Sequence, residues 1–406
     1  MTCIQKLHHT PRNREIGYVT MNENPGKLNR RVVLTVPLGG LALASLGGLA
    51  AHGDDGSTVP KYRMIGVAMP DVTAGTDRHK ELASWCEKAR INKVGLVAGR
   101  VDWTAFPSQD RSSWSSDFGE NGDKDPLRDA INIFSGDDDP GQKIVLVVDA
   151  QAERFFEKCP KFAGIDTEGR AKTNLPSLTA LVKEDSQGKF GKDIISLATE
   201  LVERYNPSAI SLTDLYFEDS TYGEDDLNHF RAATGESDWP RDDANNIKTD
   251  DERIVAWRCK AMAGFVARVR DAVHSAGNRR CELWMEVRSP RNDPHGDRKD
   301  SGQDYGLLAK AADRLVLWDY FGTEPDYLPT RDLAAAFTEK TGGSGVLSVG
   351  LWGREREDLI TPDELETAVK EAVRGGSDWV WVTPTQTVAQ PMTDAHWEAL
   401  VRAWNQ

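Results

Sequence analysis

Four acidic residues stand at the ends of apolar, β-branched runs that predict strands. They are Asp149, Asp214, Glu286 and Asp319. Two carboxylates facing one space can cleave a glycosidic bond, because one donates a proton while the other attacks or activates water. Neighbouring strands lie about 4.8 Å apart, so acids on adjacent strands come within reach of each other. We therefore expect catalytic carboxylates among Asp214, Glu286 and Asp319, with Asp149 contacting substrate.

The alternation of side chains along residues 281–288 favours Glu286. Its neighbours in the chain are apolar, whereas Trp284 and Arg288 share its side of the strand. In a closed barrel the apolar side faces the helices, so Glu286 should point into the mouth, the space at the carboxyl ends of the strands. An ion pair between Glu286 and Arg288 is the structural alternative.

The directions of the other two acids are less determined by alternation. Asp214 shares its side with Leu212, which would turn it toward the helices unless a bulge or the strand end intervenes. Asp319 lies between Trp318 and Tyr320, so either the acid or the two rings can line the site.

Aromatic residues on the late strands can provide a flat surface for a sugar. The chain has twelve Trp, and such rings either pack in a core or stack on ligands. Trp352 and Trp381 are the best candidates for stacking, with barrel filling as the alternative. Glu218 follows the fourth strand and is a binding candidate or a solvated acid. The full set of predicted substrate contacts is Asp149, Glu218, Trp284, Arg288, Trp318, Tyr320, Trp352 and Trp381.

Other chemistries have little support in the sequence. Histidines are not clustered, and no convincing order of Ser, His and Asp indicates a nucleophilic triad. Cysteines 86, 159, 259 and 281 form no pattern with zinc spacing. We therefore predict no metal and no cofactor. The cysteine spacing is compatible with buried free thiols and with disulfides.

Eight apolar runs position these residues, and an amphipathic stretch follows each of them. Continuous apolar strands that alternate with helices indicate a parallel sheet covered by helices, and eight such units predict a (β/α)₈ TIM barrel. An open doubly wound sheet is the alternative, but no glycine-rich turn follows the first strand. The predicted strands are 62–70, 93–98, 143–150, 209–216, 281–288, 314–321, 345–352 and 378–385, and the predicted helices are 79–91, 125–134, 193–205, 252–276, 305–312, 328–341, 361–374 and 393–404.

The predicted loops after strands two to five are long and polar. Since loops after the strands build the site in this fold, long loops on several strands favour a groove that holds a polymer. The barrel domain should span residues 60–406. The net charge of the chain bears on the kind of substrate. The chain carries −14, which repels nucleic acid and anionic lipid and accepts a neutral or cationic substrate more easily.

The first 51 residues have the pattern of an export signal. Arg30 and Arg31 precede an uncharged run, 32–51, that is rich in Leu, Ala and Gly and ends in small residues. The paired arginines favour the twin-arginine route. An uncleaved anchor is the alternative, although glycines and a proline make a poor membrane helix. We expect a secreted protein without stable membrane insertion after signal cleavage.

Residues 163–273 contain a series of short motifs in a distinctive order. They are Asp-Thr-Glu-Gly at 166–169, Asn-Leu-Pro at 174–176, a helix ending at Tyr205, the strand 209–217 with Leu-Thr-Asp-Leu-Tyr-Phe, then Phe-Arg-Ala-Ala-Thr-Gly at 230–235, Trp239 and Trp257-Arg258.

This order resembles the family-10-like glycosyl hydrolases, secreted TIM-barrel proteins, over about a quarter of the chain. The resemblance implies hydrolysis of a β-linked or amino-sugar-containing polymer. That family usually carries one or two Asp after the Leu of the strand; here Thr213 takes the first position and Asp214 the second.

The leading hypothesis is a secreted glycoside hydrolase acting on a polysaccharide or oligosaccharide through two carboxylates. A catalytically lapsed carbohydrate-binding barrel is the alternative, in keeping with Thr213. A barrel enzyme of another reaction class, such as a lyase or isomerase, is a third possibility.

Overall fold

The computed structural model describes residues 59–108, 124–136, 139–277, 281–319, 328–352, 359–387 and 390–405. The predicted export signal and Tyr320 lie outside these ranges. The chain from Ser57 onward forms one compact unit. No helix in the described ranges is long and apolar enough to cross a membrane.

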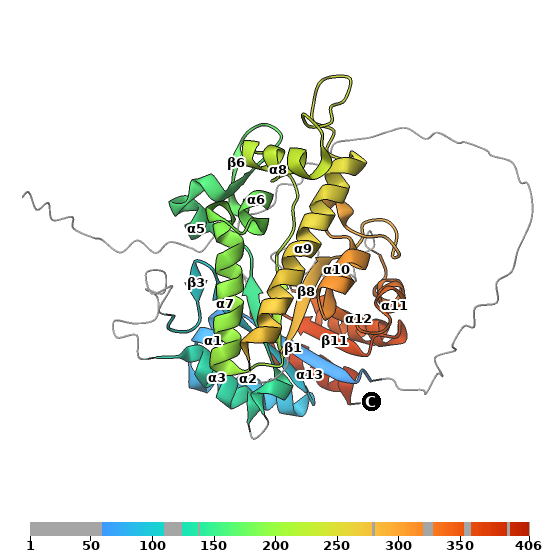
Figure 1. The fold of residues 1–406 in the computed structure, drawn as a ribbon. Coiled ribbons are helices and arrows are strands. Elements are labelled where there is room, and N and C mark those ends of the chain that lie inside the picture. Colours follow the sequence, from blue (N-terminus) through green and yellow to red (C-terminus); the bar gives the residue numbers. More distant parts are fainter. Residues whose placement is uncertain are drawn as a thin grey trace, which may run out of the picture. The chain divides into compact units, whose positions relative to one another are not determined.

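Eight parallel strands close into a barrel (Figure 1). Closure comes from the first strand, which pairs with both the second and the last. Each strand overlaps a predicted one, so the single (β/α)₈ TIM barrel is confirmed. The barrel strands are β1 (Tyr62–Val67), β2 (Lys93–Arg100), β4 (Ile144–Asp149), β7 (Ala209–Thr213), β8 (Glu282–Arg288), β9 (Arg314–Asp319), β10 (Val346–Gly350) and β11 (Trp379–Thr383).

A helix follows each strand, close to its predicted position. The clearest local signal is at 361–364, where Thr361 forms a capping box with Glu364 and Pro362 occupies the first turn. The eight helices are α2 (Thr76–Lys88), α3 (Pro126–Ser135), α7 (Lys189–Tyr205), α9 (Glu252–Ala276), α10 (Tyr305–Ala311), α11 (Thr330–Thr341), α12 (Pro362–Arg374) and α13 (Asp394–Trp404).

The long connections after β4 and β7 are more structured than the predicted polar loops. Figure 1 shows their elements grouped together. A bridge joins Ile165 to Thr221, and the buried Asp226 carboxylate accepts a hydrogen bond from the Thr179 backbone at 2.8 Å. The two insertions therefore support each other. Their elements are α5 (Glu153–Lys158), β5 (Ala163–Ile165), β6 (Ala171–Pro176) and α6 (Leu178–Val182) after β4, and α8 (Glu224–Thr234) after β7.

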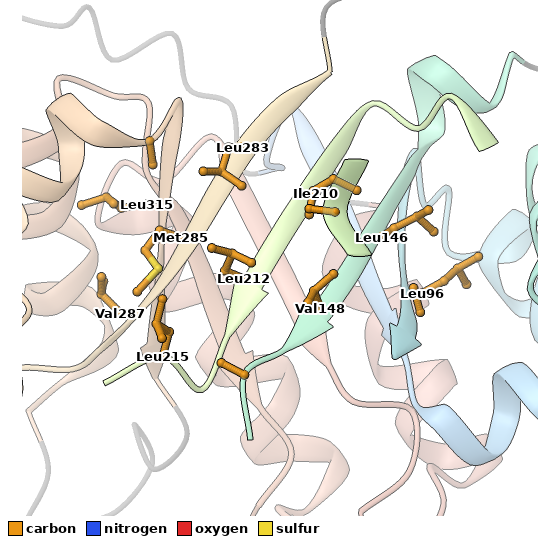
Figure 2. Packing of buried hydrophobic residues seen from close by; sticks show 14 of the residues in the cluster. Leu96, Leu146, Val148, Ile210, Leu212, Leu215, Leu283, Met285, Val287 and Leu315 are labelled. Atoms are coloured by element: carbon orange, nitrogen blue, oxygen red, sulfur yellow. The ribbon is translucent and has the colours of Figure 1, made fainter. Parts of the chain in front are cut away.

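Two apolar clusters establish which way each strand faces. One lies between strands and helices and includes Ile210, Leu212, Leu283, Met285 and Leu315 (Figure 2). The other fills the barrel interior; its members include Met64, Val145, Ala209, Trp284, Val316, Trp379 and Trp381. Alternation then turns Ser211, Thr213 and Glu286 inward.

The four cysteines in the described ranges are unpaired, and Cys86, Cys259 and Cys281 are buried. The structure thus selects free thiols from the two options that their spacing left open.

Candidate active site

Glu286 points into the mouth of the barrel, as the alternation along β8 predicts. Only 7% of its surface is exposed. The Ser211 hydroxyl donates to Oε1 at 3.3 Å, and the Trp318 indole N–H donates to Oε2. Burial raises the pKa of Glu286 to about 7, although hydrogen bonds from Thr213, Trp318 and Ser211 act in the opposite direction. The side chain can therefore exchange a proton near neutral pH.

Asp214 reaches the same space because the backbone changes conformation after β7. Its φ is 55°, in the left-handed region, so the strand ends at Thr213 and strict alternation no longer applies. Burial raises the pKa of Asp214 well above the usual aspartate range, and the charges of Asp149 and Glu286 raise it further. Asp214 therefore lies within electrostatic range of Glu286, on the adjacent strand, and of Asp149.

Asp149 ends β4 and is held by an arginine that the sequence analysis missed. Arg100 Nε lies 2.8 Å from Asp149 Oδ2, and Arg100 Nη1 lies 2.8 Å from Glu153 Oε2. Burial raises the pKa of Asp149, and the charge of Arg100 lowers it. The signal that could have found Arg100 is its place at a strand end, since β2 extends two residues beyond the predicted run.

Arg288 does not pair with Glu286. It pairs with Glu218, and its guanidinium lies 4.9 Å from the centre of the Tyr216 ring. The buried Tyr216 hydroxyl has no hydrogen-bond partner in the described part of the chain. The ring lies beside Asp214 and Glu218 in the site, although it was not among the predicted contacts. Arg100 and Arg288 are thus each committed to other acids, while Asp214 and Glu286 form no ion pair within the described ranges.

Asp319 does not join this group. It shares its side of β9 with Leu315 and Leu317, which face the helices, so alternation turns it away from the mouth. It is 4% exposed, and burial raises its pKa to about 6, opposed by the nearby Thr330 hydroxyl at the start of α11. Trp318 takes the inward position instead. The structure therefore separates Asp319 from the predicted pair.

Two of the predicted binding rings are buried in the barrel instead. Trp284 is 1% exposed and donates its N–H to Glu282 Oε2 at 2.8 Å, one layer below Glu286. Trp381 is 2% exposed and lies over Gly66 and Gly95, where a Cβ atom would collide with its indole. Both rings fill the interior. Alternation along a strand shows that they point inward, but it does not show that they lie below the mouth. Trp352 follows β10 and is half-buried.

Metal chemistry gains no direct support from this geometry. In the described part of the chain, no three His, Cys, Asp or Glu side chains are grouped as ligands of a metal ion. The arrangement that can do chemistry is the pair Asp214 and Glu286, with Asp149, Tyr216 and Trp318 beside it.

Searches with protein-family models and among curated proteins found no match to this chain. Solved structures do resemble it. The glycoside hydrolase domain of PgaB (BpsB) from Bordetella bronchiseptica has a TM-score of 0.63 at 15% identity, covering 84% of this chain and 98% of that one. The β-amylase catalytic domain from Paenibacillus polymyxa has a TM-score of 0.58 at 13% identity, covering 86% and 100%.

α-L-Fucosidase isoenzyme 2 from Paenibacillus thiaminolyticus has a TM-score of 0.56 at 16% identity, covering 85% of this chain. The chain spans 49% of that enzyme's length. At these identities the likeness concerns the fold. The chain therefore has a TIM-barrel fold of the kind that these glycoside hydrolases share.

Proposed function

We propose that this protein is a glycoside hydrolase that acts on a polysaccharide through Asp214 and Glu286. The observation that carries the proposal is the pairing of these acids in the mouth of the barrel. Asp214 follows β7 and Glu286 lies on the adjacent strand β8, the charge of Glu286 raises the pKa of Asp214, and neither acid forms an ion pair within the described ranges. Such a pair holds one proton between two carboxylates, which is the state that acid–base cleavage of a glycosidic bond requires.

The hydrogen bonds around the pair assign different roles to its two members. Glu286 accepts hydrogen bonds from Ser211 and Trp318, and donors of this kind stabilise the charged carboxylate. Asp214 faces the charges of Asp149 and Glu286, which favour its protonated form. Asp214 is therefore the proton donor to the glycosidic oxygen. Glu286 is the carboxylate that attacks the sugar or activates water.

Three similarities support a glycan substrate. The resembling structures are named as a glycoside hydrolase domain, a β-amylase and an α-L-fucosidase, and all are barrels. The motif order of residues 163–273 resembles family-10-like glycosyl hydrolases. The pattern around Arg30 and Arg31 favours export, which would bring the enzyme to cell-wall or extracellular glycans.

The test is a screen of cell-wall and extracellular polysaccharides for newly released reducing ends. Wild type, Glu286→Gln and Asp214→Asn are run side by side on any substrate that is cleaved. We expect each substitution to reduce kcat by about a thousandfold, the range for removal of an acid or base group. Unchanged hydrolysis by both variants would disprove the assignment of the pair.

The screen also separates the hydrolase from the carbohydrate-binding alternative. Thr213 contributes a hydroxyl near Glu286, whereas an Asp there would add a further carboxylate. If a polysaccharide is retained by the protein and no ends appear at any pH, the lapsed, binding-only barrel is favoured.

A further inference from the structure

Gln303 is a buried amide that joins the backbone segments carrying the two acids. It follows β8 in the chain and is 1% exposed. Its Nε2 donates to the carbonyl of Leu215 at 3.0 Å and to the carbonyl of Glu286 at 3.4 Å. Its Oε1 accepts from the backbone N–H of Arg288 at 3.0 Å. One side chain thus connects the end of β8 to the residue that follows Asp214.

The backbone of Gln303 is anchored independently of this amide. Its N–H donates to the carbonyl of Arg298 at 3.0 Å, and its carbonyl accepts from the N–H of Arg298 at 3.2 Å. Nearby, the N–H of Phe217 donates to the carbonyl of Ser301 at 2.8 Å. The loop after β8 is therefore hydrogen-bonded to the loop after β7. The backbone of Gln303 is held in place independently of its side-chain amide.

The conformation of Asp214 explains why such a contact is useful. A non-glycine residue in the left-handed region costs roughly 1 kcal/mol or more and persists when its surroundings hold it. The carbonyl held by Gln303 belongs to the next residue, Leu215. Both donors and the acceptor of the amide are used, so a side chain without N–H groups cannot reproduce the contacts.

We propose that Gln303 is a positioning residue that sets the separation and burial of Asp214 and Glu286. The inference rests on the proposed function of that pair. Gln303 acts through the backbone, because its side chain contacts carbonyl and N–H groups rather than either carboxylate. Without the amide, the end of β8 and the loop after β7 separate and water reaches the pair.

The expected result follows from the charges that face the pair. Asp149, Glu286, Arg100 and Arg288 act electrostatically on Asp214, as Asp149, Glu218 and Arg288 do on Tyr216, and changing Gln303 alters none of these charges. Burial is the main cause of the raised pKa of Glu286, so solvent access lowers it. In Gln303→Met we expect kcat to fall by about 10- to 100-fold with KM nearly constant, since small misplacements cost this much. The acidic limb of the rate profile should move down by about one pH unit.

A matched control lies at the opposite end of the barrel. Asn92 also joins two backbone groups, since its Oδ1 accepts from the N–H of Arg63 and its Nδ2 donates to the carbonyl of Lys61, both at 2.9 Å. Asn92→Leu should lower the melting temperature by a similar amount and leave the acidic limb unchanged. Gln303→Asn, which keeps an amide on a shorter side chain, should give an intermediate kcat and serves if the Met variant does not fold.

A second readout does not depend on activity. The ¹³Cδ signal of Glu286 in protein labelled at glutamate, assigned by its loss in Glu286→Gln, reports the pKa of that carboxyl directly. The midpoint should move to lower pH in Gln303→Met and stay in place in Asn92→Leu.

The outcomes distinguish the two proposals. If wild type cleaves a glycan but Gln303→Met keeps its kcat, its acidic limb and its carboxyl midpoint, the positioning role is overturned and the hydrolase stands. If activity and stability fall together in both variants without a shifted limb, Gln303 is merely structural. If wild type cleaves nothing, the hydrolase fails, and an unchanged Glu286 midpoint would then overturn the positioning role as well.

Discussion

Glu282 and Glu286 face the same way on β8 but lie at opposite ends of the barrel. Each accepts a hydrogen bond from an indole N–H, Glu282 from Trp284 and Glu286 from Trp318. Glu282 also pairs with Arg314, whose Nε lies 2.9 Å from its Oε2. Within the described ranges Glu286 has no such partner, and burial raises its pKa to about 7. Burial and charge compensation, rather than residue type, distinguish the two glutamates.

The surroundings of the two glutamates differ in the same sense. At the amino end, Arg314 lies 4.1 Å from the centre of the Trp379 ring, and Tyr62 stacks on that ring at 3.4 Å. This end is filled by rings around a compensated charge. In the mouth, Arg100 and Arg288 pair with Asp149 and Glu218, and within the described ranges neither Asp214 nor Glu286 forms an ion pair of its own.

Neutralising the two glutamates one at a time gives the largest expected contrast. Glu286→Gln should reduce kcat by about a thousandfold because it removes an acid or base group from the site. Glu282→Gln should leave kcat nearly unchanged and lower the melting temperature, because Arg314 loses its partner. Measuring kcat and thermal denaturation for both variants checks this, and equal kcat losses would contradict the division between the two ends.

Removing the two indole donors sharpens the comparison. Trp318→Phe takes a donor from Glu286, so the pKa of Glu286 should rise further and the acidic limb should move to higher pH. We expect activity below the optimum to fall by about tenfold, as for one site hydrogen bond to a charged group. Trp284→Phe should cost about 1 kcal/mol of stability without moving the limb. If the acidic limb of the pH–rate profile moves in both variants, the two ends of the barrel are not independent.

Asp226 tests whether a raised pKa by itself marks a reactive acid. Burial raises its pKa to about 7, above the unfolded value of about 3.9, in a helix outside the mouth. Its contribution to stability is therefore fully present below about pH 4 and is lost as pH rises through about 7.

Asp226→Asn should flatten the fall in melting temperature between acidic and mildly alkaline pH while kcat stays near wild type. The exposed Asp243→Asn is the control and should change neither quantity. A large loss of kcat in Asp226→Asn would show that the insertions after β4 and β7 take part in the site.

Asp319→Asn should have the smallest effect of the series. Its carboxyl faces the helices and lies near Thr330, so we expect kcat to change by less than about threefold, within the range of surface and remote substitutions. Steady-state kinetics beside Glu286→Gln checks the point. A loss that matches Glu286→Gln would restore Asp319 to the catalytic set.

The fold was predictable because its signals are local and repeated. Every barrel strand is a short apolar run. The start of a helix such as 361–374 is marked by the capping residues Thr361 and Glu364 and by Pro362 in the first turn. The insertion after β4 was missed because its strand Ala171–Pro176 is polar and partly exposed, and because Ile165 of its other strand pairs with Thr221 in a distant segment.

The sequence by itself determined the eight-unit order and the inward direction of Glu286, because both follow from alternation along one strand. Tertiary structure decided which acids meet. The left-handed backbone at Asp214 breaks the alternation that would turn it toward the helices. Asp319 follows the alternation of its strand and points away from the mouth. Only the closed barrel shows that Arg314 compensates Glu282, that Arg288 pairs with Glu218, and that Glu286 forms no ion pair within the described ranges. These pairings join separate strands and loops, and no local pattern encodes them.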